Sequence, residues 1–330
     1  MNALITGSAG FVGSHLVDLY IEKGYTVSVL LRKESNLRWL EGKNIEKCFG
    51  SYSDVDFLQS VVKNKDIIVH SAGVLASLSY DGFYKGNVLV TKQLLDAIKE
   101  VNANLQRFVH ISSLAVAQPS PNVDFPTNED DDLLEPLTRY GKSKLEAEYL
   151  VRTYSKYFPI TIIRPPSVYG PRDEAIYGYL RLISNGFIAP IMGFDSKVLS
   201  LIHVSDLVRG IYIASTTLKA ISKTYYITSK QYYTWNDIIS ATQKAVDKKL
   251  IIRVPLPNIL ITIIGYVSEF IGRLQKNPSI FDREKAKNFT QRHWICSHKK
   301  AVEELQFQQE ISLEAGMQET IEWYKKNRWM

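Results

Sequence analysis

The chain is predicted to be an α/β protein, a doubly wound parallel sheet with a smaller C-terminal substrate-binding lobe. Three observations predict this class. Apolar runs alternate with helical patterns along the first half of the 330 residues. The runs are continuously apolar, as expected for parallel strands that helices cover on both faces. Glycines follow the first run directly, at the edge where sheets of this kind bind ligands.

The first strand is expected at residues 2–6 (NALIT), and a helical pattern follows from Phe11 to Lys23. The segment 119–136 is rich in proline and acidic residues, which predicts a surface loop. The other strands are expected at 26–31 (TVSVLL), 66–73 (DIIVHSAG), 107–113 (RFVHISS) and 160–170 (ITIIRPPSVYG), and the other helices at 88–101 and 142–157.

Composition limits the classes of partner. The net charge is +6, but the lysines and arginines are spread along the chain, with no basic run interleaved with aromatic residues. Nucleic acid is therefore not an expected partner, whereas a diffuse positive field suits an anionic cofactor or substrate. Cys48 and Cys296 have no metal-ligand spacing, so we expect no metal site, no disulfide framework and a reducing, cytoplasmic compartment. The first residues lack the pattern of a secretory signal.

The most apolar stretch is 255–274 (PLPNILITIIGYVSEFIGRL). Between Pro257 and Glu269 it is shorter than the roughly 20 apolar residues that cross a bilayer, so no transmembrane segment is expected. We interpret it as a buried helix of the C-terminal lobe. Two alternatives stay open: an apolar wall over a substrate pocket, or a helix that rests on a membrane surface in peripheral contact.

The stretch TGSAGFVGSHLV places Gly7, Gly10 and Gly13 between the first strand and the first helix, together with Phe11 and Val12. Glycine at such a turn lets the backbone approach a pyrophosphate, while the helix N-terminus offers amide donors and a favourable dipole. The turn therefore predicts dinucleotide binding. Its spacing, G-x-x-G-x-x-G, differs from the general G-x-G-x-x-G fingerprint.

Residues 138–148 (TRYGKSKLEAE) place Tyr140 and Lys144 one helical turn apart, so that both side chains reach the same space. An ammonium beside a phenol lowers the phenol pKa. The pair is therefore expected to act as a proton donor and acceptor near neutral pH.

In these motifs the chain resembles the extended short-chain dehydrogenase/reductases of the NAD-dependent epimerase/dehydratase superfamily, which have a Rossmann fold. The stretches RPPSVYGPRD and LSLIHVSDL and the C-terminal pattern from REKAKNFTQRHW to IEWYKKNRWM look most similar to the dihydroflavonol-reductase and 3β-hydroxysteroid-dehydrogenase branch. The resemblance rests on the three glycines, Asn87 in GNVLVT, Ser113 in HISS, the YxxxK of Tyr140 and Lys144, Arg164-Pro165, and His203-Val204 with Asp206-Leu207.

The resemblance implies a catalytic set. Tyr140 would be the general acid/base at a substrate oxygen, and Ser113 would hydrogen-bond the same oxygen. Lys144 would lower the Tyr140 pKa and hold the nicotinamide ribose. Asn87 is expected to support helix packing near the site, and His203 and Asp206 are expected to be structural.

Cofactor contacts are implied for Tyr140 and Lys144 and also for Ala72, Gly73, Pro165 and Ser167. The resemblance implies a homodimer formed through a helix bundle. We expect residues 1–165 to form the dinucleotide-binding domain, with 200–227 returning to it, and 166–199 and 228–330 to form the substrate-binding lobe.

The end of the second strand favours NADP(H) over NAD(H). NAD-preferring relatives place a carboxylate there, but this chain has Leu31, followed by Arg32 and Lys33. Arg32 can bind a 2′-phosphate bidentately, whereas a carboxylate would repel it. The family's aspartate near the adenine is replaced by Ser51.

Two positions bear on the substrate. Sugar-nucleotide enzymes of the family typically have an asparagine where this chain has Ser167, and a diphosphate-clamping arginine where it has Leu199. The sequence therefore predicts an oxidoreductase that interconverts a ketone and a secondary alcohol on an apolar small molecule, steroid-, flavonoid- or alkyl-ketone-like. Two alternatives stay open: an NDP-sugar epimerase or dehydratase, and a non-catalytic cofactor-binding subunit.

Overall fold

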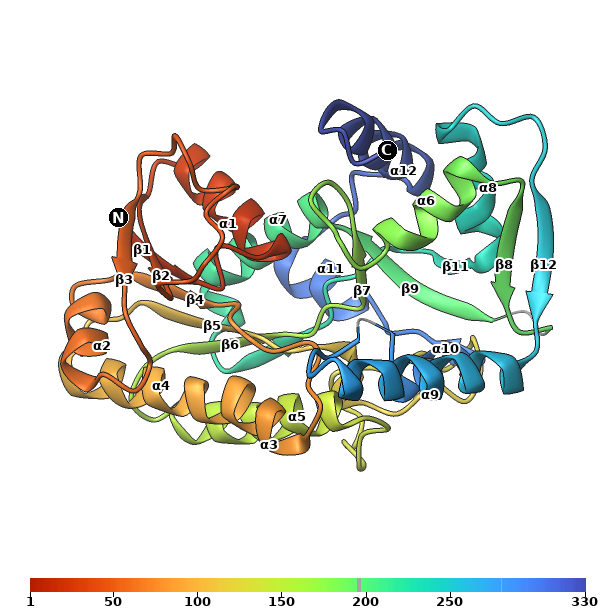
Figure 1. The fold of residues 1–330 in the computed structure, drawn as a ribbon. Coiled ribbons are helices and arrows are strands. Elements are labelled where there is room, and N and C mark those ends of the chain that lie inside the picture. The colour runs from red at the N-terminus through yellow and green to blue at the C-terminus, as the bar shows by residue number, and fades with distance from the viewer. Residues whose placement is uncertain (195–196, 280) are drawn as a thin grey trace.

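The computed structural model describes residues 1–194, 197–279 and 281–330 (Figure 1). Within these residues the largest element is a parallel sheet of seven strands in the order β10-β6-β5-β4-β1-β2-β3. Helices cover both faces, so the predicted doubly wound α/β class is confirmed. The strands of this sheet are β1 (Asn2–Thr6), β2 (Thr26–Leu31), β3 (Glu46–Phe49), β4 (Ile67–His70), β5 (Arg107–Ile111), β6 (Ile160–Ile163) and β10 (Lys223–Tyr225).

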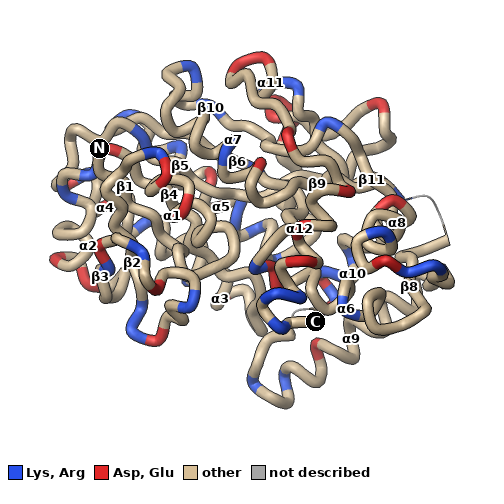
Figure 2. The backbone as a smooth tube through the Cα atoms, turned by 90° about the horizontal axis from the view of Figure 1, so that it is seen from above, with Lys and Arg blue, Asp and Glu red and all other residues tan. Residues whose placement is uncertain are grey.

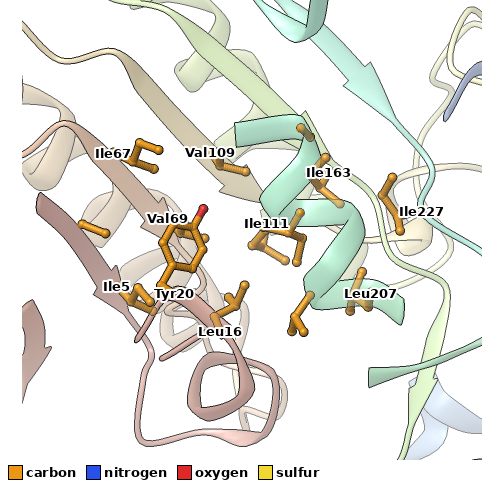
Figure 3. Packing of buried hydrophobic residues seen from close by; sticks show 14 of the residues in the cluster. Ile5, Leu16, Tyr20, Ile67, Val69, Val109, Ile111, Ile163, Leu207 and Ile227 are labelled. Carbon is orange, nitrogen blue, oxygen red and sulfur yellow. The ribbon is translucent and has the colours of Figure 1, made fainter. Parts of the chain in front are cut away.

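Two apolar layers hold the helices on the sheet. On one face Leu16 and Tyr20 of α1 pack with Leu207 of α7 against Val69 and Ile163 (Figure 3). On the other face α2, α4 and α5 bury a separate cluster. Figure 1 shows the two helix layers above and below the sheet. Their bounds are α1 (Phe11–Glu22), α7 (Val204–Thr216), α2 (Val55–Val62), α4 (Val90–Val101) and α5 (Arg139–Thr153).

Several boundaries differ from the sequence prediction for physical reasons. The expected strand 160–170 is divided into β6 and β7 (Ser167–Tyr169), because the prolines between them have no N–H to continue a ladder. Helix α5 begins at Arg139, where the Thr138 hydroxyl caps it by accepting from the Gly141 amide at 3.0 Å. Ahead of α4 the chain forms the short helix α3 (Tyr80–Phe83) and a π-helical segment, Tyr84–Leu89.

The C-terminal lobe has its own sheets and an aromatic core. In the part of the chain that the structure describes, β9 pairs with β7, β11 and β13, and β12 pairs with β8. Tyr169, Trp235, Met317 and Tyr324 belong to the buried cluster of this lobe. Its elements are α6 (Tyr177–Asn185), β8 (Ile188–Met192), β9 (Val198–His203), β11 (Tyr232–Thr234), α8 (Trp235–Ala245), β12 (Ile252–Leu256), α9 (Asn258–Leu274), α10 (Arg283–Thr290), β13 (His293–Trp294), α11 (Lys299–Leu305) and α12 (Leu313–Lys326).

Helix α9 corrects one interpretation. The stretch 255–274 was expected to be a buried helix, but α9 buries only Ile261, Gly265, Glu269 and Gly272 among its seventeen residues. The narrow inner face rests on α10, and most of the apolar side chains face outward. No helix within the described residues is long and apolar enough to cross a membrane.

A buried ion pair fastens α5 to the sheet. The Arg164 guanidinium donates to both carboxylate oxygens of Glu148, at 2.9 and 2.8 Å, and both side chains are buried. Burial by itself would raise the pKa of Glu148, but the hydrogen bonds and charge of Arg164 outweigh burial and lower that pKa. Arg152 contacts the same carboxylate from the surface at 2.9 Å.

Glu148→Gln is expected to lower the free energy of unfolding by roughly 3–5 kcal/mol, because it leaves the buried charge of Arg164 unpaired. Urea denaturation measures the loss. Arg152→Gln is the matched control, since it removes the exposed partner of the same carboxylate and should cost less than about 1 kcal/mol. Equal losses for the two variants would contradict the assignment of Arg164–Glu148 as the dominant pair.

Candidate active site

The glycine turn after β1 has the tight backbone that its sequence predicts. Gly7 adopts φ +69°, and a Cβ there would lie 2.7 Å from the Ala72 amide nitrogen. A Cβ on Gly13 would lie 2.1 Å from the Gly7 carbonyl oxygen. Both positions therefore require glycine, because a side chain would collide with backbone that cannot yield.

The residues at this turn fit a dinucleotide. Helix α1 begins behind Gly10, and within the described chain no side chain caps it and no acidic residue lies in its first turn. The amides of this turn, Phe11 and Val12 included, therefore face a site with no competing carboxylate, which suits a pyrophosphate. The Ser8 hydroxyl is buried there and has no hydrogen-bond partner among the described residues.

Arg32 and Lys33 follow β2 at the same edge of the sheet. The Arg32 side chain is 72% exposed, and its Nε lies 3.5 Å from Glu34 Oε1. An exposed pair of this kind is weak, so the guanidinium can turn toward an anion.

Ser113 and Tyr140 meet at the carboxyl end of β5. The Ser113 hydroxyl accepts from the Ala115 amide at 3.1 Å and so caps the short 3₁₀ turn Leu114–Val116. A Cβ on Gly141 would lie 2.1 Å from the Ala115 carbonyl oxygen, so glycine lets the start of α5 pack against this turn. The contact brings the Tyr140 phenol into a hydrogen bond with Ser113.

The electrostatics of Tyr140 differ from the sequence expectation. Burial raises the pKa of Tyr140 to about 12, and the hydrogen bond from Ser113 offsets only part of this rise. Lys144 is not among the groups that lower the pKa of the phenol in this arrangement, and its ammonium donates to the Ile111 carbonyl at 2.6 Å. The phenol is therefore protonated at neutral pH and is suited to give a proton.

Lys144 is itself perturbed. Its side chain is buried, and burial lowers the pKa of the ammonium to about 8, although the charge of Glu148 opposes this shift. The amine therefore still carries its proton at neutral pH and loses it only slightly above.

Asn87 connects the carboxyl end of β4 to α5. Its Oδ1 accepts from the Val74 amide at 2.7 Å, and its Nδ2 donates to the Val74 carbonyl at 3.1 Å and to the Ser143 hydroxyl at 2.8 Å. This holds the segment after β4 so that Gly73 lies beside the Lys144 ammonium, which is 3.9 Å from where a Gly73 Cβ would stand. Ala72 and Gly73 thus adjoin both the glycine turn and α5.

His70 was not singled out from the sequence. It is fully buried at the end of β4, where Nδ1 lies 2.8 Å from the Thr6 hydroxyl and Nε2 lies 2.9 Å from the Thr91 hydroxyl. Burial lowers the pKa of His70 to about 3, so the ring is neutral. It ties β1, the glycine-turn strand, to α4. A histidine at the end of an apolar run was the only signal in the sequence.

Pro165 and Asp206, two residues of the later signatures, make contacts that hold neighbouring segments. The Pro165 carbonyl accepts from the Leu114 amide at 2.8 Å, next to Ser113. Asp206 accepts from the Glu310 and Ile311 amides at 3.0 Å each and so anchors the C-terminal segment.

A cavity of about 200 Å³ lies in the lobe. Ser167 and Leu199, the two positions from which the sequence predicts the class of substrate, both line it. Its other lining residues are Lys197, Val198, Trp235, Lys285, Asn288, Phe289, Gln291 and Trp294. A larger hollow of about 530 Å³ lies between the acidic segment 129–132 and Lys223. None of Ser113, Tyr140 and Lys144 lines either the cavity or this hollow.

Known proteins are similar to this chain in sequence and in fold. Residues 3–228 match the sequence model of the NAD dependent epimerase/dehydratase family. A ceramide reductase of Caulobacter vibrioides is 26% identical over 99% of this chain and 95% of the relative. A decarboxylating sterol-4-alpha-carboxylate 3-dehydrogenase of Dictyostelium discoideum is 29% identical over 64% of this chain and 67% of the relative. The structure of a UDP-glucuronic acid 4-epimerase from Bacillus cereus with UDP-glucuronic acid and NAD has a TM-score of 0.78 and 25% identity, covering 99% of this chain and 100% of the other.

Lys144→Met is expected to remove part of the pH dependence of stability. The pKa of Lys144 is about 8 in the folded chain, against 10.5 for an unperturbed lysine. Between these values the unfolded state binds more protons, so this group makes the free energy of unfolding rise with pH, by up to about 1.4 kcal/mol per pH unit. Urea denaturation at about pH 8 and about pH 10 should show a larger rise for the wild type than for the variant. Parallel pH dependences would show that Lys144 is not perturbed.

Proposed function

The chain belongs to the NAD-dependent epimerase/dehydratase family, and on that premise we propose that it is an NADP(H)-dependent reductase, or the reverse dehydrogenase, of an apolar ketone. Membership makes it an NAD(P)-dependent enzyme of the extended short-chain dehydrogenase/reductase type. The proposal adds the preference for NADP(H), the class of substrate and the residues that act on it.

In this proposal the chemistry is divided between cofactor and chain. A bound nicotinamide dinucleotide supplies or accepts the hydride. Tyr140 transfers the proton at the substrate oxygen, and the Ser113 hydroxyl hydrogen-bonds that oxygen. Lys144, held by the Ile111 carbonyl, is charged below about pH 8 and would hold the nicotinamide ribose. Because the pKa of Tyr140 is raised to about 12, the protonated phenol favours reduction of a ketone.

The lining of the lobe cavity carries the proposal of an apolar substrate. Leu199 and Ser167 both line this cavity, where the sugar-nucleotide enzymes that the chain resembles typically have arginine and asparagine. Trp235, Phe289 and Trp294 supply further apolar surface. The names of two relatives, a ceramide reductase and a sterol dehydrogenase, describe work on predominantly apolar molecules.

Polar groups in the same cavity suggest that the substrate has one polar end. The Lys197 ammonium lies in the wall, where it donates to Asn258 and to the Phe289 carbonyl at 2.7 and 2.8 Å. Asn288 Oδ1 is buried with no hydrogen-bond partner among the described residues, and burial lowers the pKa of Lys285. A long-chain or polycyclic ketone with one hydrogen-bonding group suits this lining.

The arrangement of parts is proposed with the activity. Residues 1–165 and the segment 200–227 would bind the dinucleotide, and residues 166–199 and 228–330 would bind the substrate. The segment 200–227 is itself divided. Its first residues, up to His203, belong to β9 in the sheet of the lobe, whereas α7 and β10 pack with the large sheet. A homodimer and a cytoplasmic location complete the proposal, and both cysteines are free thiols.

A substrate panel tests the proposed activity. Purified protein with NADPH should reduce long-chain or polycyclic ketones and should leave UDP- and dTDP-sugars unchanged. Tyr140→Phe should slow ketone reduction about 10²–10⁴-fold, because it removes the proton donor, while NADPH binding measured by fluorescence persists.

The main alternative, an NDP-sugar epimerase or dehydratase, is favoured by the solved structure that holds UDP-glucuronic acid and NAD. The two cavity lysines could accommodate a diphosphate. Turnover of sugar nucleotides alone in the panel would establish that alternative and end the proposal of an apolar ketone.

Arg32→Ala is expected to weaken NADPH binding about tenfold or more, since charged hydrogen bonds to the 2′-phosphate are lost, and to leave NADH binding unchanged. Isothermal titration with both cofactors measures the ratio. Arg181→Ala, on α6 of the lobe, is the control and should bind both as the wild type does. An unchanged NADPH to NADH ratio in Arg32→Ala would contradict the role of Arg32.

A further inference from the structure

Helix α9 is amphipathic in the reverse of the usual sense. A surface helix normally turns its apolar face to the core, but here the apolar residues face outward, and Leu274 is 69% exposed. The inward residues are two glycines, one isoleucine and one glutamate. The exposed apolar residues of the helix, called here the α9 face, are Ile259, Leu260, Ile263, Ile264, Tyr266, Val267, Phe270, Ile271 and Leu274.

The inner side fixes this orientation. A Cβ on Gly265 would lie 2.8 Å from the Ala286 Cβ, so glycine lets α9 lie directly on α10. Glu269 points inward and pairs with Arg273 at 2.7 Å and with Arg283 at 3.2 Å. Rotating the helix to hide its apolar face would break this ion cluster. The α9 face therefore stays outward.

The charge around the α9 face is one-sided. From residue 258 to residue 279 the sequence has two basic residues, Arg273 and Lys276, both exposed at the C-terminal end of the helix, and a single acidic one, Glu269, which is buried. Figure 2 shows α9 uncharged along most of its length, with basic residues toward its C-terminal end. Apolar surface bordered by cations complements an anionic lipid surface. A second copy that met this face with its own α9 would bring the same cations and no exposed carboxylate on that helix.

We propose that the α9 face docks this protein on the surface of an anionic lipid bilayer. Binding to the bilayer does not depend on the protein being an enzyme. The role that we assign to this binding, uptake of an apolar substrate from the bilayer, rests on the proposed function. Helix α10 connects the α9 face to the cavity of the lobe, because it packs on α9 and also carries Lys285, Asn288 and Phe289 in the cavity wall.

The docked segment also contacts the catalytic helix. Arg139, the residue before Tyr140, donates from its backbone amide to Glu284 at 2.9 Å and from its guanidinium Nε to the same carboxylate at 2.6 Å. Its Nη2 lies 3.9 Å from Glu269 of α9. The bilayer-facing helix and the start of α5 are thus joined through one buried ion cluster.

Co-sedimentation of the full chain with vesicles tests the proposal. The wild type should bind vesicles of phosphatidylcholine with phosphatidylglycerol, and should bind pure phosphatidylcholine at least about fivefold more weakly. Ile263→Gln with Phe270→Gln should weaken binding to the anionic vesicles about tenfold or more, because both side chains leave the lipid boundary. Leu134→Gln with Leu218→Gln, two exposed leucines elsewhere, is the matched control and should bind as the wild type does.

Two outcomes would overturn the proposal. One is equal vesicle binding by the α9 variant and the wild type. The other is a wild type that ignores vesicles but sediments as a dimer which the α9 variant converts to a monomer, since a second copy would then cover the face. The rate at which a water-soluble ketone is reduced should be the same in the wild type and in the α9 variant. This measurement distinguishes a failure of catalysis from a failure of docking.

Discussion

The active site depends on one constraint, that helix α5 lies directly against the carboxyl ends of β5 and β6. Gly141 allows the close approach, Lys144 donates to the Ile111 carbonyl, and Glu148 pairs with Arg164. These contacts follow one another along a single face of the helix, about one turn apart. Tyr140, the proposed proton donor, is therefore positioned by groups that belong to the core of the sheet, whereas a loop would leave it mobile.

This placement explains the electrostatics of the site. The same burial that fixes α5 removes water from the phenol and from the ammonium, so it raises the pKa of Tyr140 and lowers the pKa of Lys144. Both shifts favour the neutral forms of the two groups. A protonated phenol beside Ser113 is poised to donate a proton, which matches the reductive direction of the proposed reaction better than the oxidative one.

Much of the fold and part of the site could be predicted because their signals are local. Continuous apolar runs reveal buried strands, and the glycine turn has a fixed spacing that its backbone requires. Hydropathy cannot tell which face of a helix is covered, so α9 was wrongly expected to be buried. Lys197 and Lys285 enter the cavity from segments far apart in sequence, and no spacing connects them. The raised pKa of Tyr140 depends on tertiary burial, which the one-turn spacing to Lys144 does not encode.

In the proposed function the lobe selects one class of substrate, and the central claim is net hydride transfer to an apolar ketone. Following the C4 deuterium of NADPH deuterated on both faces of its reduced ring tests that claim most directly. Mass spectrometry should find one deuterium on the carbinol carbon of the alcohol, with NADP⁺ formed in equal amount. Conversion of a sugar nucleotide without net consumption of cofactor, and no deuterium in any alcohol, would contradict the account.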